Sequence, residues 1–400
     1  MQAHSLYLHI PFCSHRCGYC DFNTYSGLET LIPEYVGALC QEIRYVGRSS
    51  PQKIPVHTVF FGGGTPSLLP GKEIQRIFAT LEQEFHLLDG LEVTLEANPG
   101  RLTHEYFKTI RDLGVNRISL GMQSANPEDL LLLERQHGFQ HVVKAVSLIR
   151  KAGINNLNLD LIFGIPYQTL ASWRRTLDHA IALNPDHISL YALTIENGTP
   201  MGSWVNRGML SEPDPDLAAD MYELAADNLN THGYEQYEIS NWARRDAGGK
   251  LLACQHNLQY WRNFFYIGCG AGAHGFAGGK RTENELNPKK YVQMLNSPVE
   301  TSIPDNYPFP KNPATKNTIE IHRAQEMKET MLMGLRLTEE GVSNAGFNER
   351  FGLDLNAAFK VEIDQSIASG LLEWQTGEGK RLRLTPHGRL LGNQVFMQFV

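Results

Sequence analysis

Three cysteines stand close together near the start of the chain. The segment reads Cys13-Ser-His-Arg-Cys17-Gly-Tyr-Cys20, so three residues separate the first two thiols and two residues separate the last two. Six cysteines in 400 residues are too few for a disulfide scaffold, and a cluster of thiols favours metal binding. Three thiolates leave one corner of a tetrahedral metal or of a cubane cluster unfilled.

Two kinds of metal site fit these thiols when the residues are taken alone. A structural zinc site normally has four ligands, and His9 or His15 could supply the fourth. The run C-x2-C-x2-C-x3-C of bacterial ferredoxins does not match. An iron–sulfur cluster with one open iron is favoured by context, because the cysteines follow a predicted strand and face the turn Gly62-Gly63-Gly64-Thr65-Pro66.

Alternating strands and helices are predicted over the first half of the chain. The strands are Leu6–Ile10, Thr58–Phe61, Glu92–Glu96, Arg117–Gly121, Leu157–Ile162 and His187–Leu193. The helices are Leu31–Val46, Gly71–Phe85, Thr103–Leu113, Phe139–Ala152 and Leu170–Leu183. Six successive β-α units predict an α/β fold with a parallel sheet curled into a full or partial barrel. Chemistry is then expected at the carboxyl ends of the strands, where the polar segments fall.

The alternation weakens after about residue 200. We expect a helix at Leu217–His232, a strand at Tyr234–Ile239, a glycine-rich loop at Asn263–Gly279 and a linker at Asn296–Asn317, which holds five prolines. A helix at Ile319–Leu335 and a hairpin of Leu371–Thr376 with Arg381–Leu384 predict a C-terminal α+β winged-helix-like domain. The predicted division is 1–240, 241–317 and 318–400.

Charge and hydropathy exclude several classes of protein. The 36 Lys and Arg against 43 Asp and Glu give a net charge of −7, which disfavours a nucleic-acid binder. From His322 onward nine basic residues face ten acidic ones, so structural packing is expected of the last domain rather than DNA binding. No apolar run is long enough for an integral membrane segment, and the N-terminus lacks the pattern of a secretory signal. A cytoplasmic protein is expected.

The spacing C-x3-C-x2-C, with the aromatic Tyr19 before the last cysteine, resembles the signature of the radical S-adenosylmethionine (SAM) enzymes. In that family three thiolates hold a [4Fe–4S] cluster, and its fourth iron binds the amino and carboxylate groups of SAM. The resemblance implies that Cys13, Cys17 and Cys20 hold such a cluster. It also implies the fold of the family, a partial (β/α)6 TIM-type barrel.

The resemblance extends to the branch around oxygen-independent coproporphyrinogen III oxidase. It is carried by Leu6–Phe12, the glycine turn, Glu96–Pro99, Gly121–Ser124 and Asp160–Gly164. It implies that Tyr7, Gly63 and Glu96 line the first SAM. Tyr19, Gly64, Thr65, Gln123, Arg135 and Asp160 match residues that contact a second SAM in the oxidase. Taken alone, the glycines also suit a tight turn, and Glu96 and Asp160 could pair with Arg117 or Arg135.

Three features separate the chain from the oxidase. Phe22 stands where the oxidase carries a further cysteine, and only twelve residues precede Cys13 where the oxidase has a long arm. The run His256-Asn-Leu-Gln-Tyr-Trp261 resembles the H-N-x-x-Y-W motif of the HemW heme chaperones. Histidine is a common axial ligand of heme iron, although a lone histidine near aromatic residues is more often structural. The second axial ligand of the heme iron is not identified; the candidates are Cys254, Cys269 and His274.

The resemblance therefore implies a heme chaperone of the radical SAM fold that binds SAM and delivers heme b to client hemoproteins such as respiratory enzymes. Peripheral contact with membrane clients and a homodimer are compatible with it. Cleavage of SAM is left open. The alternative is decarboxylation of coproporphyrinogen III, as in the oxidase.

Overall fold

The computed structural model describes residues 3–100, 102–296, 308–375 and 380–400. The chain forms two compact units. The first combines Met1–Asn228 with Phe265–Ile319, and the second combines Leu229–Phe264 with Glu320–Val400. The predicted heme-motif segment is thus divided between the two units, and the three-part division of the sequence remains a prediction.

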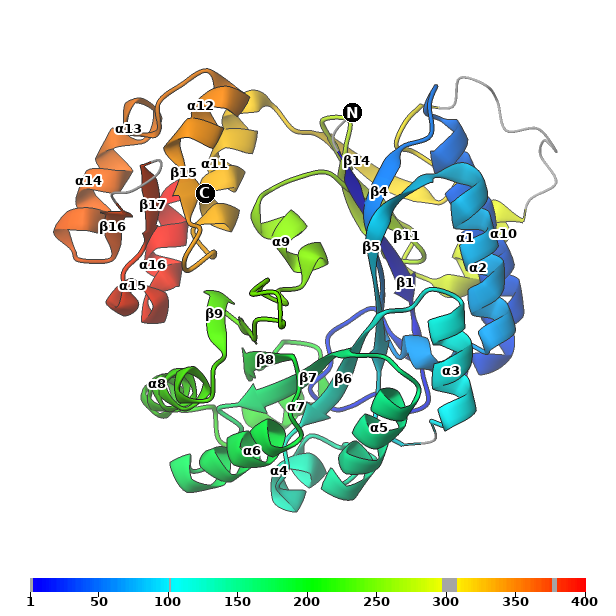
Figure 1. The fold of residues 1–400 in the computed structure, drawn as a ribbon, viewed down its shortest axis with the longest axis horizontal. Coiled ribbons are helices and arrows are strands. Elements are labelled where there is room, and N and C mark those ends of the chain that lie inside the picture. Colours follow the sequence, from blue (N-terminus) through cyan, green and yellow to red (C-terminus); the bar gives the residue numbers. More distant parts are fainter. Residues whose placement is uncertain (1–2, 101, 297–307, 376–379) are drawn as a thin grey trace. The chain divides into compact units, whose positions relative to one another are not determined.

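A curved parallel sheet forms the centre of the first unit (Figure 1). Its neighbouring strands, in order, are β1 (His4–Ile10), β4 (Pro55–Gly63), β5 (His86–Ala97), β6 (Arg117–Gln123), β7 (Asn156–Phe163) and β8 (His187–Ala192). Each pairs in parallel with the next. The partial barrel is confirmed, and so are the predicted strands. Most residues of β1, β6 and β7 are buried, as expected for strands covered on both faces.

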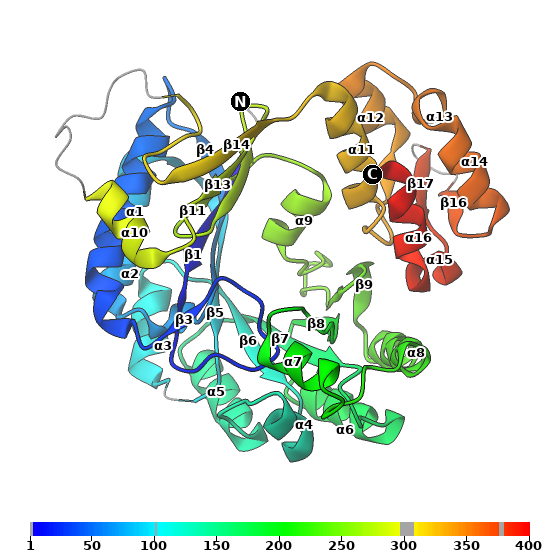
Figure 2. The same cartoon turned by 180° about the vertical axis from the view of Figure 1, so that it is seen from behind.

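Helices follow the strands along the outer side of this sheet, as Figures 1 and 2 both show. They are α1 (Ile32–Arg48), α2 (Gly71–Glu84), α3 (His104–Asp112), α5 (Phe139–Lys151) and α6 (Leu170–Ala182), with the shorter α4 (Pro127–Leu132) and α7 (Pro200–Asn206) and then α8 (Pro215–Thr231). Gly114 and Gly153 follow α3 and α5 with φ of +111° and +86°, and glycine adopts such values without strain. The predicted helix ends are confirmed there.

The prediction of a glycine-rich loop at Asn263–Gly279 is wrong. This segment holds β11 (Tyr266–Cys269), which pairs in parallel with β1, and β12 (His274–Ala277), which pairs antiparallel with β13 (Lys280–Asn284). Glycine is required because the backbones approach closely: a Cβ on Gly268 would lie 1.9 Å from the His274 carbonyl oxygen. The helix α10 (Pro288–Leu295) follows.

The predicted linker Asn296–Asn317 lies partly outside the described residues. Its last residues enter β14 (Thr315–Glu320), an edge strand of the same sheet. The short strands β2 (Phe12–Cys13) and β3 (Tyr25–Ser26) pair with each other. The segment Cys13–Cys20, called the cysteine loop below, starts in β2 and ends before β3.

The second unit contains the predicted helices and the predicted hairpin, of which Thr376 lies outside the described residues. It comprises β9 (Glu235–Glu238), β10 (Asn241–Ala243), α9 (Gln255–Trp261), α11 (Arg323–Gly334), β15 (Val342–Ser343), α12 (Asn344–Phe351), α13 (Leu355–Ala358), α14 (Lys360–Ala368), β16 (Leu372–Gln375), β17 (Arg381–Leu384), α15 (Pro386–Leu390) and α16 (Gly392–Phe396). Leu335, Phe347, Ile363 and Leu382 are among the buried residues of its core. Helix α11 begins at Arg323 rather than Ile319, because Ile319 belongs to β14.

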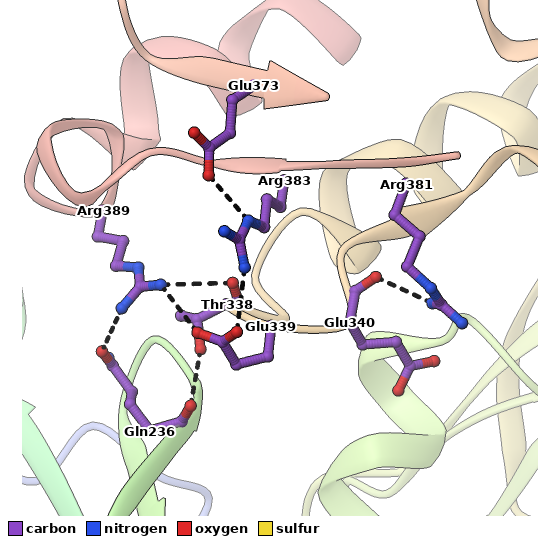
Figure 3. A network of polar contacts seen from close by, with 8 residues as sticks. All are labelled: Gln236, Thr338, Glu339, Glu340, Glu373, Arg381, Arg383 and Arg389. Atoms are coloured by element: carbon purple, nitrogen blue, oxygen red, sulfur yellow. Dashed lines mark hydrogen bonds and ion pairs between the residues drawn. The ribbon is translucent and has the colours of Figure 1, made fainter. Parts of the chain in front are cut away.

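Arginines on and beside the hairpin have acidic and carbonyl partners within the second unit (Figure 3). Arg383 donates to Glu373 at 2.9 Å and to Glu339 at 3.0 Å, and Arg389 donates to Glu339 at 3.2 Å. Arg381 donates to the Glu340 carbonyl oxygen at 3.0 Å. These three arginine side chains therefore have hydrogen-bond partners inside the second unit.

Candidate functional site

The cysteine loop begins where β1 ends and runs past the carboxyl ends of the neighbouring strands (Figure 2). Cys13 is buried, Cys17 and Cys20 are partly buried, and all three thiols are free. A backbone hydrogen bond from the Cys20 amide to the Cys17 carbonyl oxygen, 3.1 Å long, closes the last turn of the loop. Burial is the main cause that raises the pKa of the Cys13 and Cys17 thiols.

Side chains from two other loops reach the thiols, and a side chain from a third loop bridges these two side chains. The Thr65 hydroxyl donates to Cys13 Sγ at 3.7 Å, and Arg135 Nη1 donates to Cys17 Sγ at 3.7 Å. Asn98 lies between these two donors: its Nδ2 donates to Thr65 Oγ1 at 2.9 Å, and its Oδ1 accepts from Arg135 Nη2. The cysteine loop is thereby tied to the carboxyl ends of β4 and β5.

The three thiols are of the chemical type that holds iron–sulfur clusters, because cysteine thiolates are the usual ligands of such clusters. Within the described part of the chain, no group of three or more His, Cys, Asp or Glu side chains is placed as the ligands of one metal ion. A donor at Cys13 and another at Cys17 can stabilise the negative charge that deprotonated thiols carry.

The glycine turn after β4 packs tightly against the cysteine loop. Gly64 N donates to the Ile10 carbonyl oxygen at 2.9 Å, and Thr65 N donates to the Phe12 carbonyl oxygen at 2.8 Å. A Cβ on Gly64 would lie 2.6 Å from that Phe12 oxygen, and one on Gly63 would lie 2.5 Å from the His9 ring. Close packing within the chain thus accounts for these two glycines by itself.

The partly buried Tyr7 and the buried His9 form a hydrogen-bonded pair on β1. His9 Nε2 lies 2.9 Å from the Asn23 carbonyl oxygen, so Nε2 carries the proton and Nδ1 is the acceptor. The Tyr7 hydroxyl, 3.0 Å from Nδ1, is therefore the donor. Burial lowers the pKa of His9 and raises that of Tyr7, so both side chains are neutral near pH 7.

Two carboxylates lie close enough to influence each other. Glu96 accepts one hydrogen bond, from Gly63 N at 3.0 Å, and its pKa is raised to about 8, first by burial and then by Asp160. Asp160 accepts from Ser119 at 2.9 Å and from Asn158 at 2.8 Å, and burial raises its pKa as well. Glu96 is partly exposed and has spare acceptor capacity, so this pair can bind a cation.

Tyr19 and Gln123 lie near Arg135. Burial raises the pKa of Tyr19 to about 12, against the opposing effect of Arg135. Gln123 has φ of +63°, and its Nε2 stands 2.9 Å from the Cβ position of Gly121. The structure thus gathers the residues expected from the sequence around the barrel end: Tyr7, Cys13, Cys17, Tyr19, Cys20, Gly63, Gly64, Thr65, Glu96, Gln123, Arg135 and Asp160.

His256 belongs to the second unit and lies in α9. Its side chain is 1% exposed, and its Nε2 lies 2.9 Å from the Tyr260 hydroxyl oxygen one turn later. The Trp261 ring stacks against Arg336, whose Cζ lies 5.2 Å from the ring centroid. Ligation of iron through Nε2 therefore requires the contact with Tyr260 to open. Of the open second ligands, Cys254 lies in the same unit, and Cys269 and His274 lie in the first.

Sequence reasoning gave no individual role to Asn98, Ser119 or Asn158. Asn98 bridges Thr65 and Arg135, and the other two hold Asp160 in place. For Asn98, the feature of the sequence that could have indicated a role is its position directly after a predicted strand. Ser119 and Asn158 lie inside strands, where polar residues in an otherwise apolar run pointed to partners in the barrel.

Comparison with known proteins identifies the family. The model of the radical SAM superfamily matches residues 7–180, and that of the HemN C-terminal domain matches residues 321–391. The chain is 35% identical over 398 residues to the heme chaperone HemW of Bacillus subtilis, covering 99% of both chains. It is 36% identical to that of Escherichia coli over 405 residues, covering 99% of this chain and 98% of the relative.

A solved structure shares the fold over nearly the whole length. The coproporphyrinogen III oxidase HemN of Escherichia coli, described as a radical SAM enzyme, superposes with a TM-score of 0.80 at 23% identity, covering 99% of this chain and 90% of that one. The much higher identity to the chaperones places the chain on their side of this branch. The chain belongs to the HemW heme chaperone family of the radical SAM superfamily.

Proposed function

We propose that this protein carries heme b to client hemoproteins, with a [4Fe–4S] cluster held by Cys13, Cys17 and Cys20 and with SAM bound beside it. The observation that carries the proposal is the free, partly enclosed trio of thiols at the carboxyl end of the barrel, with donors aimed at two of them. The relatives of Bacillus subtilis and Escherichia coli are heme chaperones, and heme is therefore the cargo that we propose for this chain.

The carboxylates beside the glycine turn support binding of SAM. SAM carries a sulfonium and an ammonium group, and Glu96 offers a carboxylate with one protein donor and unused acceptor positions. Burial and, after it, repulsion by Asp160 raise the pKa of Glu96 to about 8, and a bound cation offsets the repulsion. Bound to an open iron, SAM would supply redox chemistry, and these residues would orient it.

His256 is proposed as an axial ligand of heme iron. Tyr260 and Trp261 are partly buried on the same helix and offer aromatic faces beside the imidazole. Because His256 is hydrogen-bonded to Tyr260, ligation exchanges that hydrogen bond for an iron bond. The exchange lowers the net affinity, which suits a carrier that must release its cargo. A cytoplasmic location, a homodimer and contact with membrane clients remain proposals; no helix in the described residues is long and apolar enough to span a bilayer.

Anaerobic heme titration of the reconstituted protein tests the carrier function. We expect one heme per chain, and we expect His256→Gln to weaken binding at least tenfold (about 1.4 kcal/mol) while the iron–sulfide content stays unchanged. Glutamine can keep a polar contact with Tyr260, so its effect reports ligation more than packing. His232→Gln, an exposed position in the same unit, is the matched control.

Two outcomes would contradict the proposal. In the first, the wild-type protein binds no heme, or binds it as tightly after His256→Gln as before. In the second, the protein with SAM and a reductant converts coproporphyrinogen III to protoporphyrinogen IX, which would make it an oxidase of the HemN type.

A further inference from the structure

A directional chain of hydrogen bonds connects two of the three thiols. It runs from Arg135 to Asn98, from Asn98 to Thr65 and from Thr65 to Cys13, while a second donor of Arg135 reaches Cys17 directly. Asn98 touches neither sulfur, yet its amide contacts both Thr65, which donates to Cys13, and Arg135, which donates to Cys17.

The direction of each hydrogen bond follows from the chemistry of the groups. Arginine can only donate, so the side-chain oxygen of Asn98 faces Arg135 and its NH2 faces Thr65. The Thr65 oxygen accepts from that NH2, which leaves the single hydroxyl hydrogen for Cys13. Hydrogen bonds in series polarise one another, so the charge of Arg135 strengthens the donor at Cys13.

The amide of Asn98 is held firmly in this orientation. Arg135 Nη2 also donates to the Gly121 carbonyl oxygen at 3.1 Å. A Cβ on Gly121 would lie 3.0 Å from Asn98 Oδ1 and 3.2 Å from Arg135 Nη2, so these groups fill the space above the glycine. The short side chain at residue 121 thus admits the guanidinium and the amide together.

We propose that Asn98 is a positioning residue that couples the Arg135 and Thr65 donors and thereby raises the reduction potential of the cluster. Hydrogen bonds to cluster sulfur stabilise the more negative, reduced form and raise its potential. The inference rests on the proposed function, because it needs a cluster at these thiols. It assigns to Thr65 and Arg135 a role toward the thiols in addition to any contact with SAM.

An EPR-monitored redox titration of anaerobically reconstituted, SAM-free protein tests the coupling. Asn98→Leu keeps the size of the side chain and removes both its hydrogen bonds, and Thr65→Val removes the donor at Cys13 without changing charge. We expect each variant to lower the midpoint potential at an iron content equal to wild type. The double variant should shift the potential by less than the sum of the two. The Thr24 hydroxyl lies 3.8 Å from Cys20 Sγ and also interacts with Cys13, but it does not belong to the chain through Asn98, so Thr24→Val should combine additively with Asn98→Leu.

The outcomes separate this inference from the proposed function. An unchanged potential in Asn98→Leu, or additive shifts in the double variant, would overturn the coupling while leaving the cluster assignment intact. Wild-type protein without iron and sulfide would overturn both. Should Asn98→Leu fail to retain the cluster, Asn98→Ala removes the same two hydrogen bonds without adding charge; it must lower the potential, or the coupling is wrong.

Discussion

Two carboxylates in the first unit, the buried Glu42 and the partly exposed Glu96, differ in how fully their hydrogen-bonding capacity is used. Glu42, on α1, accepts hydrogen bonds from Gly270 N at 2.7 Å, from Asn284 at 2.6 Å, from Asn312 at 2.8 Å and from the Tyr291 hydroxyl. Glu96, at the barrel end, has one hydrogen-bond donor among the described residues, Gly63 N. Burial raises the pKa of both, to about 7 and about 8. The chain satisfies Glu42 completely, whereas Glu96 keeps capacity for a ligand.

The difference between the hydrogen-bond partners of Glu42 and Glu96 shows which of the two carboxylates is structural. The donors to Glu42 come from segments far apart in the sequence and hold α1 against the loop after β11, β13 and α10. The donor to Glu96 comes from the glycine turn beside the cysteines, and the neighbouring Asp160 disfavours its charge. A fully satisfied carboxylate stabilises the fold, and an under-satisfied one is available for binding.

Glu42→Gln is expected to have the largest effect on stability. The NH2 group of glutamine cannot accept a hydrogen bond, so donors that now reach the carboxylate would lose their acceptor. The free energy of unfolding should therefore fall by about 2–4 kcal/mol. Denaturant unfolding of the cluster-free protein measures it. A loss below about 1 kcal/mol would show that the network does not hold the fold together.

Glu96→Gln, unlike Glu42→Gln, should affect the binding of SAM and leave the stability of the fold nearly unchanged. The amide oxygen can still accept from Gly63 N, so the free energy of unfolding should stay within about 1 kcal/mol of wild type. The affinity of the reconstituted protein for SAM should fall at least tenfold, because the carboxylate charge is lost. Isothermal titration checks this, and equal affinities in the two proteins would remove Glu96 from the SAM site.

The pH dependence of stability follows from the same raised pKa values. Between pH 4.5 and about 8 Glu96 is ionised in the unfolded chain and protonated in the folded one. The folded state then binds more protons, so this stability is present at low pH and is lost as pH rises through about 8, by at most about 1.4 kcal/mol per pH unit. Glu96→Gln should flatten the profile in this window, and an unchanged slope would contradict the pKa shift.

Tyr291→Phe should give the smallest effect. It removes one donor to Glu42 and leaves the other three in place. The expected loss is about 1 kcal/mol of unfolding free energy, measured by the same denaturant series. A loss of unfolding free energy as large as that of Glu42→Gln would contradict the view that the four donors jointly stabilise the Glu42 carboxylate.

Local patterns predicted much of this molecule. The parallel strands and their helices follow from hydrophobic runs and glycine stops, and the cysteine loop is readable because its thiols lie within eight residues. The strands β11 and β12 escaped prediction because their glycines serve close backbone approach rather than a turn. The partners of Glu42, up to 270 residues away in the sequence, could not be predicted, since only the folded chain brings them together.

The candidate site likewise has parts that the sequence predicts and parts that only the structure shows. The types and spacing of Cys13, Cys17 and Cys20 predict a cluster before any fold is known, whereas the bridge made by Asn98 depends on the geometry of several loops. The motif at His256 predicts heme binding only by resemblance. Its hydrogen bond to Tyr260, which ligation must replace, is visible only in the structure.

Iron and acid-labile sulfide analysis of strictly anaerobic wild-type protein and its Cys17→Ser variant tests the central claim most directly. We predict about four irons and about four sulfides per wild-type chain, the composition of a [4Fe–4S] cluster, and a large loss of both after Cys17→Ser. A wild-type protein that contains zinc without sulfide, or a variant that keeps its full iron content, would contradict the assignment of the three thiols.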